Sequence, residues 1–126
     1  MRAIIYYFTK DVFLENPHMF FTDAQHTEDL LRSEGLKSFV MVDTHEDKSV
    51  KSKREYAEKL FIIYNDGTEE GNPLRTPAGQ QKIRSSGVGH TSMSINDFVV
   101  IDGDVLVVDS QGFNSSIQCS CMSYQE

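Results

Sequence analysis

The sequence contains too few cysteines for a disulfide framework. Its two cysteines are Cys119 and Cys121, and residues two apart on a strand project to the same side with poor geometry for a disulfide bond. Structural zinc sites usually space their cysteines as Cys-x-x-Cys. The two are in phase with Ile117, so we predict reduced, metal-free thiols on a half-buried strand. Such cysteine usage favours a reducing compartment, and we expect the protein in the cytoplasm.

Long apolar runs and an excess of basic residues are also missing. No run approaches the roughly 20 apolar residues that a membrane-spanning helix needs. The apolar stretch Ala3–Phe8 is short and aromatic, which is typical of a first strand and not of a signal peptide. The 19 acidic residues outnumber the 12 basic ones, for a net charge of -7. This charge disfavours direct nucleic-acid binding and suits either an ordinary acidic surface or a basic protein partner.

Complete catalytic, nucleotide-binding and metal-binding motifs are absent from the sequence. There is no Gly-x-Ser-x-Gly elbow, no Walker loop and no Gly-x-Gly-x-x-Gly turn. The cysteines and histidines could in principle bind zinc, but buried thiols are the simpler interpretation. The acidic residues near His45 could bind a hard cation, but a solvated loop is the simpler interpretation there. We therefore expect no cofactor and no metal, and a protein that is not an enzyme.

The patterns that are present predict one α+β domain over residues 1–126. We expect a mainly antiparallel sheet with two to three helices packed on it and a C-terminal β-hairpin, with a small, partly closed barrel as the alternative for the C-terminal half. The expected elements are a central strand at Ala3–Phe8, a helix over Asp23–Glu34 capped by Thr22, a strand at Ser38–Val42, an exposed loop at Asp43–Lys48, a helix from the Ser52 cap to Tyr64, and a short helix opened by Pro77 and ended by Gly87 or Gly89.

The hairpin is the most regular feature of the sequence. The runs Phe98–Ile101 and Asp104–Val108 flank Asp102-Gly103, and a type I′ turn with two positive φ angles favours this dipeptide. Because both runs are almost unbroken apolar stretches, we expect the hairpin to lie inside the sheet.

The segment Gly89–Phe113 carries a set of spaced polar and glycine residues around that hairpin. It resembles the signature of the YodL-like group of small proteins, which are widespread in bacteriophages and mobile elements. The matching residues are His90, Ser92, Ser94, Asp97, Gly112 and Phe113, and Asn72-Pro73-Leu74 and Thr76-Pro77 resemble the stretch upstream of the signature in phage members. The resemblance implies a small accessory protein of viral or mobile-element origin, acting in the host cytoplasm, without an activity that can be carried over.

Three functions fit these observations. The leading one is a non-catalytic protein that binds a host protein and modulates or inhibits it, as a monomer or a homodimer. The second is a protein that binds or sequesters a small ligand, such as a nucleotide or signalling molecule. The third is a hydrolase that uses Ser92, His90 and Asp109.

The candidate binding residues follow from the same segment. Polar loop residues often hold turns, and Ser94 with Asp97 could form a structural clasp that leads into the strand at Phe98. Alternatively, the loop residues converge at one end of the sheet and contact a partner or ligand. The predicted binding residues are His90, Thr91, Ser92, Ser94, Asp97, Asp109, Gly112 and Phe113.

Overall fold

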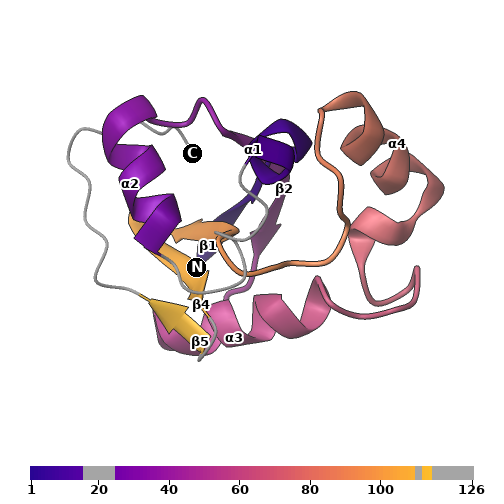
Figure 1. Ribbon diagram of the computed structural model, residues 1–126. Helices are drawn as coiled ribbons and strands as arrows, with labels where there is room; N and C mark the ends of the chain where they lie inside the picture. Colours follow the sequence, from indigo (N-terminus) through magenta and orange to yellow (C-terminus); the bar gives the residue numbers. More distant parts are fainter. Residues whose placement is uncertain (16–24, 110–111, 115–126) are drawn as a thin grey trace.

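The sequence folds around a central strand whose side chains are buried on both faces. The computed structural model describes residues 1–15, 25–109 and 112–114 (Figure 1). In chain order the elements are β1 (Arg2–Phe8), α1 (Lys10–Glu15), α2 (Gln25–Glu34), β2 (Phe39–Glu46), α3 (Lys53–Ile63), the 3₁₀ helix η2 (Pro73–Arg75), α4 (Pro77–Ser85), β3 (Phe98–Ile101), β4 (Asp104–Asp109) and β5 (Gly112–Asn114). The predicted α+β class is confirmed.

The five strands form one antiparallel sheet in the order β2-β1-β3-β4-β5. In β1, every residue after Arg2 is buried, and the strand pairs with β2 on one side and β3 on the other. A strand covered on both faces needs a nearly continuous apolar sequence, which is what Ala3–Phe8 supplies. The prediction of a central first strand is therefore confirmed.

Helices cover both faces of this sheet. On one face, α3, η2 and α4 contribute Tyr56, Leu60, Leu74 and Ile83 to a buried cluster with every second residue of β1. On the other face, α1 and α2 pack against the alternate residues of β1 (Figure 1). Truncating one such large core side chain typically costs about 2–5 kcal/mol. The fold is thus a helix–sheet–helix arrangement with two cores.

Local capping signals set the ends of the helices on the first face. The Ser52 side chain accepts a hydrogen bond from the Glu55 amide in the first turn of α3. The Thr76 side chain accepts one from the Gly79 amide in the first turn of α4. After α4 the chain turns at Gly87, whose φ of +82° suits a residue without a Cβ. The predicted Ser52 cap, the cap at Thr76 and the predicted end of the helix at Gly87 are confirmed.

The hairpin prediction is also confirmed. The two strands pair from Phe98 with Val107 to Ile101 with Asp104. Asp102 and Gly103 have φ angles of +46° and +91°, as the type I′ turn requires.

One prediction about local structure is wrong, and one helix was not predicted. The stretch expected as an exposed loop after Val42 continues β2 as far as Glu46, because it pairs residue by residue with the first half of β1. The six-residue helix α1, directly after β1, was not expected at all. The predicted strand at Cys119 and Cys121 and the predicted Thr22 cap lie outside the described residues.

No helix in the described parts of the chain has the length and apolar character to cross a membrane.

Candidate functional site

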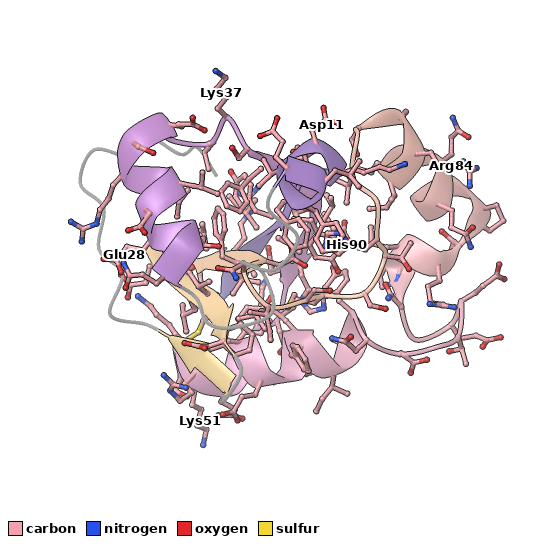
Figure 2. All side chains as sticks on the ribbon, in the orientation of Figure 1. Asp11, Glu28, Lys37, Lys51, Arg84 and His90 are labelled. Atoms are coloured by element: carbon pink, nitrogen blue, oxygen red, sulfur yellow. The ribbon has the colours of Figure 1, made fainter. Side chains whose placement is uncertain are left out.

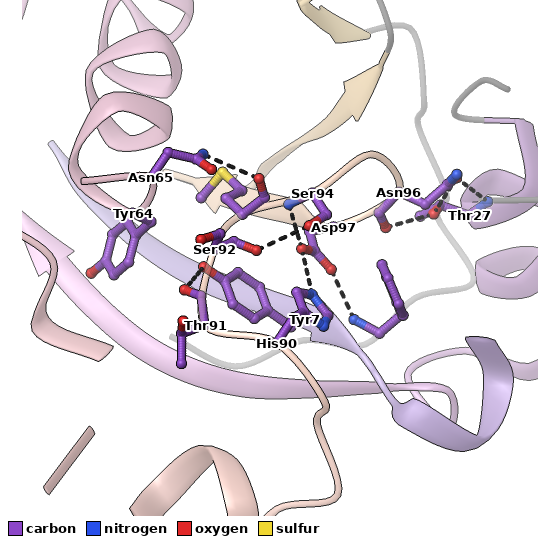
Figure 3. A network of polar contacts seen from close by, with 12 residues as sticks. Tyr7, Thr27, Tyr64, Asn65, His90, Thr91, Ser92, Ser94, Asn96 and Asp97 are labelled. Atoms are coloured by element: carbon purple, nitrogen blue, oxygen red, sulfur yellow. Dashed lines mark hydrogen bonds and ion pairs between the residues drawn. The ribbon is translucent and has the colours of Figure 1, made fainter. Parts of the chain in front are cut away.

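A buried carboxylate organises the segment that the sequence analysis singled out. Asp97 has no exposed side-chain surface. Its Oδ1 accepts the Phe8 amide at 3.0 Å, and its Oδ2 accepts the Ser94 amide at 2.7 Å and contacts His90 Nε2 at 2.8 Å (Figure 3). One side chain therefore joins the end of β1, the 90–94 loop and the start of β3.

The partners of Asp97 define its charge and the orientation of the imidazole. Burial raises the pKa of the Asp97 carboxyl, whereas His90 and the amides of Ser94 and Phe8 act in the opposite direction. Because both amides can only donate, the carboxylate is the form that accepts all three contacts. We therefore assign a proton to His90 Nε2, on the side that faces Asp97.

Aromatic contacts fix the His90 ring in place. The ring stacks on Tyr7 with centroids 4.7 Å apart and an interplanar angle of 11°, and it lies 4.4 Å from the Phe8 ring. The Tyr7 hydroxyl donates to the Thr91 carbonyl at 3.1 Å, and burial raises the pKa of this hydroxyl. These contacts fix the position of the His90 side chain, and 20% of it is still exposed at the surface.

A second buried polar residue, Asn96, joins the same turn to helix α2. Asn96 has a φ of +76°, an uncommon conformation that asparagine tolerates better than most residues. Its side-chain oxygen accepts the Thr27 amide at 3.1 Å, and the Thr27 hydroxyl donates to the Asn96 carbonyl at 2.7 Å (Figure 3). Residues 94–97 thus form a polar clasp, which is a set of buried hydrogen bonds that connects α2, β1 and β3.

The upstream Asn72-Pro73-Leu74 stretch holds the other side of the loop. The fully buried Asn72 side chain donates to the Tyr64 carbonyl at 2.9 Å and to the Thr91 carbonyl at 3.4 Å, and its oxygen accepts the Leu74 amide. These contacts connect the end of α3 to the 90–94 loop. The two stretches for which the sequence analysis noted a resemblance are therefore in contact in space.

Two pockets lie on either side of Gly89 and His90. The first, of about 490 Å³, has apolar walls from β1, α1 and Ile95, including Phe8, Phe13 and Leu14. The second, of about 640 Å³, is bounded by the end of α4 and by residues 87–92. Lys10, Gly89 and His90 line both pockets.

Sequence reasoning missed the α1 side of this site. The consecutive apolar residues Val12, Phe13 and Leu14 could have indicated an element that packs on the sheet. A six-residue helix, however, is too short for helical periodicity to identify.

The eight predicted binding residues separate into two groups. His90, Thr91, Ser92, Ser94 and Asp97 cluster around the clasp. Asp109, Gly112 and Phe113 instead line a pocket of about 350 Å³ against α3. There Phe113 is buried and meets Phe61 edge-on at 6.2 Å.

The predicted hydrolase geometry is not present in this arrangement. The carboxylate that orients His90 is Asp97, where the hypothesis used Asp109. Within the described residues no hydrogen bond joins the Ser92 hydroxyl to His90, and the Ser92 carbonyl accepts the Ser94 hydroxyl at 3.0 Å. The described part of the chain also holds no group of three histidine, cysteine, aspartate or glutamate residues that could bind a metal ion.

Fold and site together define a small α+β protein with a polar clasp at one end of an antiparallel sheet. No family model matches the chain, and no solved structure matches it. The chain is 32% identical over 115 residues to "Uncharacterized protein R785" of Acanthamoeba polyphaga mimivirus, which covers 91% of this chain and 92% of that protein. The chain belongs to the family of this viral protein. Its resemblance to YodL-like proteins stays a prediction.

Proposed function

We propose that the chain is a non-catalytic viral accessory protein that binds a component of the host cell in the apolar pocket beside His90. The observation that carries the proposal is this pocket of about 490 Å³, a size and apolar character typical of ligand sites. His90 lies at its edge, fixed by Asp97 and by two aromatic rings. The family relation to a viral protein and the YodL-like resemblance support the same setting.

A binding role accounts for the geometry better than catalysis does. The Asp97–His90 pair resembles two members of a catalytic triad, but such a pair needs a nucleophile within hydrogen-bond reach of the imidazole. In the described residues His90 has its polar contact with Asp97, and its ring is stacked in place. His90, held by Asp97, instead forms a fixed part of the pocket wall.

A second candidate is a protein partner on the surface formed by α3 and β5. Here Ile62 is 71% exposed and Phe61 37% exposed, beside the pocket that contains Phe113. Exposed apolar residues that adjoin a pocket are typical of protein interaction sites. This surface would serve either the predicted host protein in the cytoplasm or a second copy of the chain.

A pull-down with paired variants tests both candidates. Tagged wild type, Leu14→Glu and Ile62→Glu are incubated with host-cell lysate, and bound proteins and small molecules are identified by mass spectrometry. Leu14 is 61% exposed at the pocket, so its substitution should preserve the fold and place a carboxylate among the apolar walls. We expect Leu14→Glu to lose the bound component and Ile62→Glu to keep it.

The opposite pattern would move the function to the α3–β5 surface, and light scattering of wild type against Ile62→Glu would then separate a homodimer from a host protein. Equal retention by both variants would contradict both candidates.

A further inference from the structure

The outer surface of α3 places exposed apolar side chains next to a pocket. Among the large apolar residues that are exposed in the described parts of the chain, Phe61 and Ile62 adjoin each other. Beside them lies the pocket of about 350 Å³ whose wall includes the buried Phe113. An exposed isoleucine next to a hollow is complementary to a second copy of the same surface, because the Ile62 side chain of each copy can enter the pocket of the other.

Charge is distributed unevenly along this surface. Residues 48–54, which lead into α3, contain four of the 12 basic residues of the chain and no acidic one. The turn after the helix, residues 65–70, contains three acidic residues and no basic one. Lys51 projects outward at the start of α3 (Figure 2), and the chain continues beyond the end of the helix, away from its start (Figure 1). The surface is therefore basic at one end, apolar in the middle and acidic at the other end.

This order of charges does not stabilise the helix itself. The macrodipole of a helix favours acidic residues at its start and basic residues at its end. The first turn of α3 contains Lys53 and Arg54 beside one acid, Glu55, and its last turn contains no basic residue. A charge order that works against the helix is one that contacts between chains can use.

A second copy of the chain supplies the complementary order. When two α3 helices lie antiparallel about a two-fold axis beside Phe61 and Ile62, the basic start of each helix faces the acidic 65–70 turn of the other. The two macrodipoles then also oppose each other. Two copies of a chain with a net charge of -7 repel each other, so a contact between them must bring opposite charges together. The antiparallel arrangement of α3 does this at both of its ends.

We infer that the chain forms a homodimer through α3, with the two helices antiparallel and Ile62 of each copy in the pocket of the other. The inference rests on the second candidate of the proposed function, the α3–β5 surface, and names its partner; the pocket beside His90 has no part in it. The apolar centre provides affinity, and the charged ends set the orientation. A contact made by one helix and a sheet edge is small, so we expect a dissociation constant on the order of micromolar.

The test is analytical ultracentrifugation of the purified protein between about 1 and 100 μM, a range that spans such a dissociation constant. We expect the wild type to pass from monomer to dimer. Ile62→Glu should raise the dissociation constant by at least about tenfold, because it buries a carboxylate among apolar groups. Lys51→Glu should raise it by about fivefold, and the double variant Lys51→Glu/Glu69→Lys should restore it, because both members of each charge pair are then reversed.

The matched control is Lys37→Glu, which makes the same change in net charge at an exposed lysine far from Lys51 (Figure 2) and should dimerise like the wild type. Lys51 and Ile62 are both exposed, so thermal unfolding of the dilute variants should match the wild type. A glutamate before the helix also suits the macrodipole, so loss of the dimer in Lys51→Glu cannot come from a weaker helix.

A monomeric wild type would overturn the inference, as would a dimer that Ile62→Glu leaves intact. Equal weakening by Lys51→Glu and Lys37→Glu, or a double variant as weak as Lys51→Glu, would contradict the antiparallel arrangement. A monomeric wild type that loses a host protein in the Ile62→Glu pull-down would give this surface to that host protein. The pull-down with Leu14→Glu decides the proposed function of the other pocket separately.

Discussion

Residues 43–46 of β2 and the loop 90–97 each hold a histidine and an aspartate, but their polar groups have different surroundings. On β2, the Tyr64 hydroxyl donates to Asp43 at 2.6 Å, and His45 Nδ1 lies 2.6 Å from the Tyr56 hydroxyl. Asp43 and His45 are both half-buried on an edge strand, and Thr44 and Glu46 between and after them are exposed.

In the loop, Asn96 and Asp97 are fully buried, and their side chains accept the amides of Thr27, Phe8 and Ser94. The comparison teaches that the cost of removing a polar side chain depends on whether water can take its place. At β2, Asp43 and His45 are half-buried, so water can enter where one of these side chains is removed. At the loop, a lost partner leaves a buried donor unpaired, and that costs the full desolvation of the group.

The strongest test of this difference is Asp97→Ala against Asp43→Ala. Asp97→Ala leaves the buried amides of Phe8 and Ser94 without an acceptor, and we expect it to lower the free energy of unfolding by about 3–5 kcal/mol. For Asp43→Ala we expect about 1 kcal/mol, because Asp43 is half-buried on the edge strand and its truncation opens the buried Tyr64 hydroxyl to water. Urea denaturation of the two variants measures both values. Similar costs would mean that burial does not distinguish the two regions.

A smaller effect is expected at Asn96. Asn96→Ala removes the acceptor of Thr27 and forces an alanine to a φ of +76°, for a combined cost of about 2–3 kcal/mol. Asn96→Gly also loses the acceptor but adopts positive φ readily, so it should recover about 1 kcal/mol. If glycine and alanine are equally destabilising in thermal or urea unfolding, backbone conformation contributes nothing at this turn.

The β2 side should show its own dependence on pH. Burial raises the pKa of Tyr56 to about 12, so between about pH 10 and 12 the unfolded chain ionises this residue while the folded chain does not. The stability that the neutral hydroxyl contributes is present below about pH 10 and is lost as the pH rises through about 12. Urea unfolding at pH 8, 10 and 11 should show this fall, and Tyr56→Phe should reduce it. His45→Ala keeps the tyrosine and should retain the fall; a Tyr56→Phe curve parallel to wild type would contradict the assignment.

The smallest effect is expected at Ser92. Its carbonyl accepts the Ser94 hydroxyl, and a carbonyl survives substitution of the side chain. Ser92→Ala should therefore change the free energy of unfolding by no more than about 0.5 kcal/mol. His90→Ala, in contrast, removes a ring stacked on Tyr7 and a partner of Asp97 and should cost about 2–4 kcal/mol. Equal thermal shifts of the two variants would contradict the structural role of His90.

The sequence by itself determined the elements whose signals are local. The Asp102-Gly103 turn and the caps at Ser52 and Thr76 depend on residues within four positions of one another, so their geometry can be read from spacing. The burial of β1 on both faces followed from its unbroken apolar run. The sequence also identified the loop 90–97, but it left open whether the loop is a structural clasp or a binding site.

Only the tertiary structure decided the length of β2 and the composition of the site. β2 reaches Glu46 because β1 supplies a pairing partner, which overrides the polar character of its last residues. Asp97 accepts the Phe8 amide across 89 positions of sequence, and the pocket combines α1 with residues 89–95. Contacts over such separations depend on where the sheet places its strands, and no local pattern of residues records that placement.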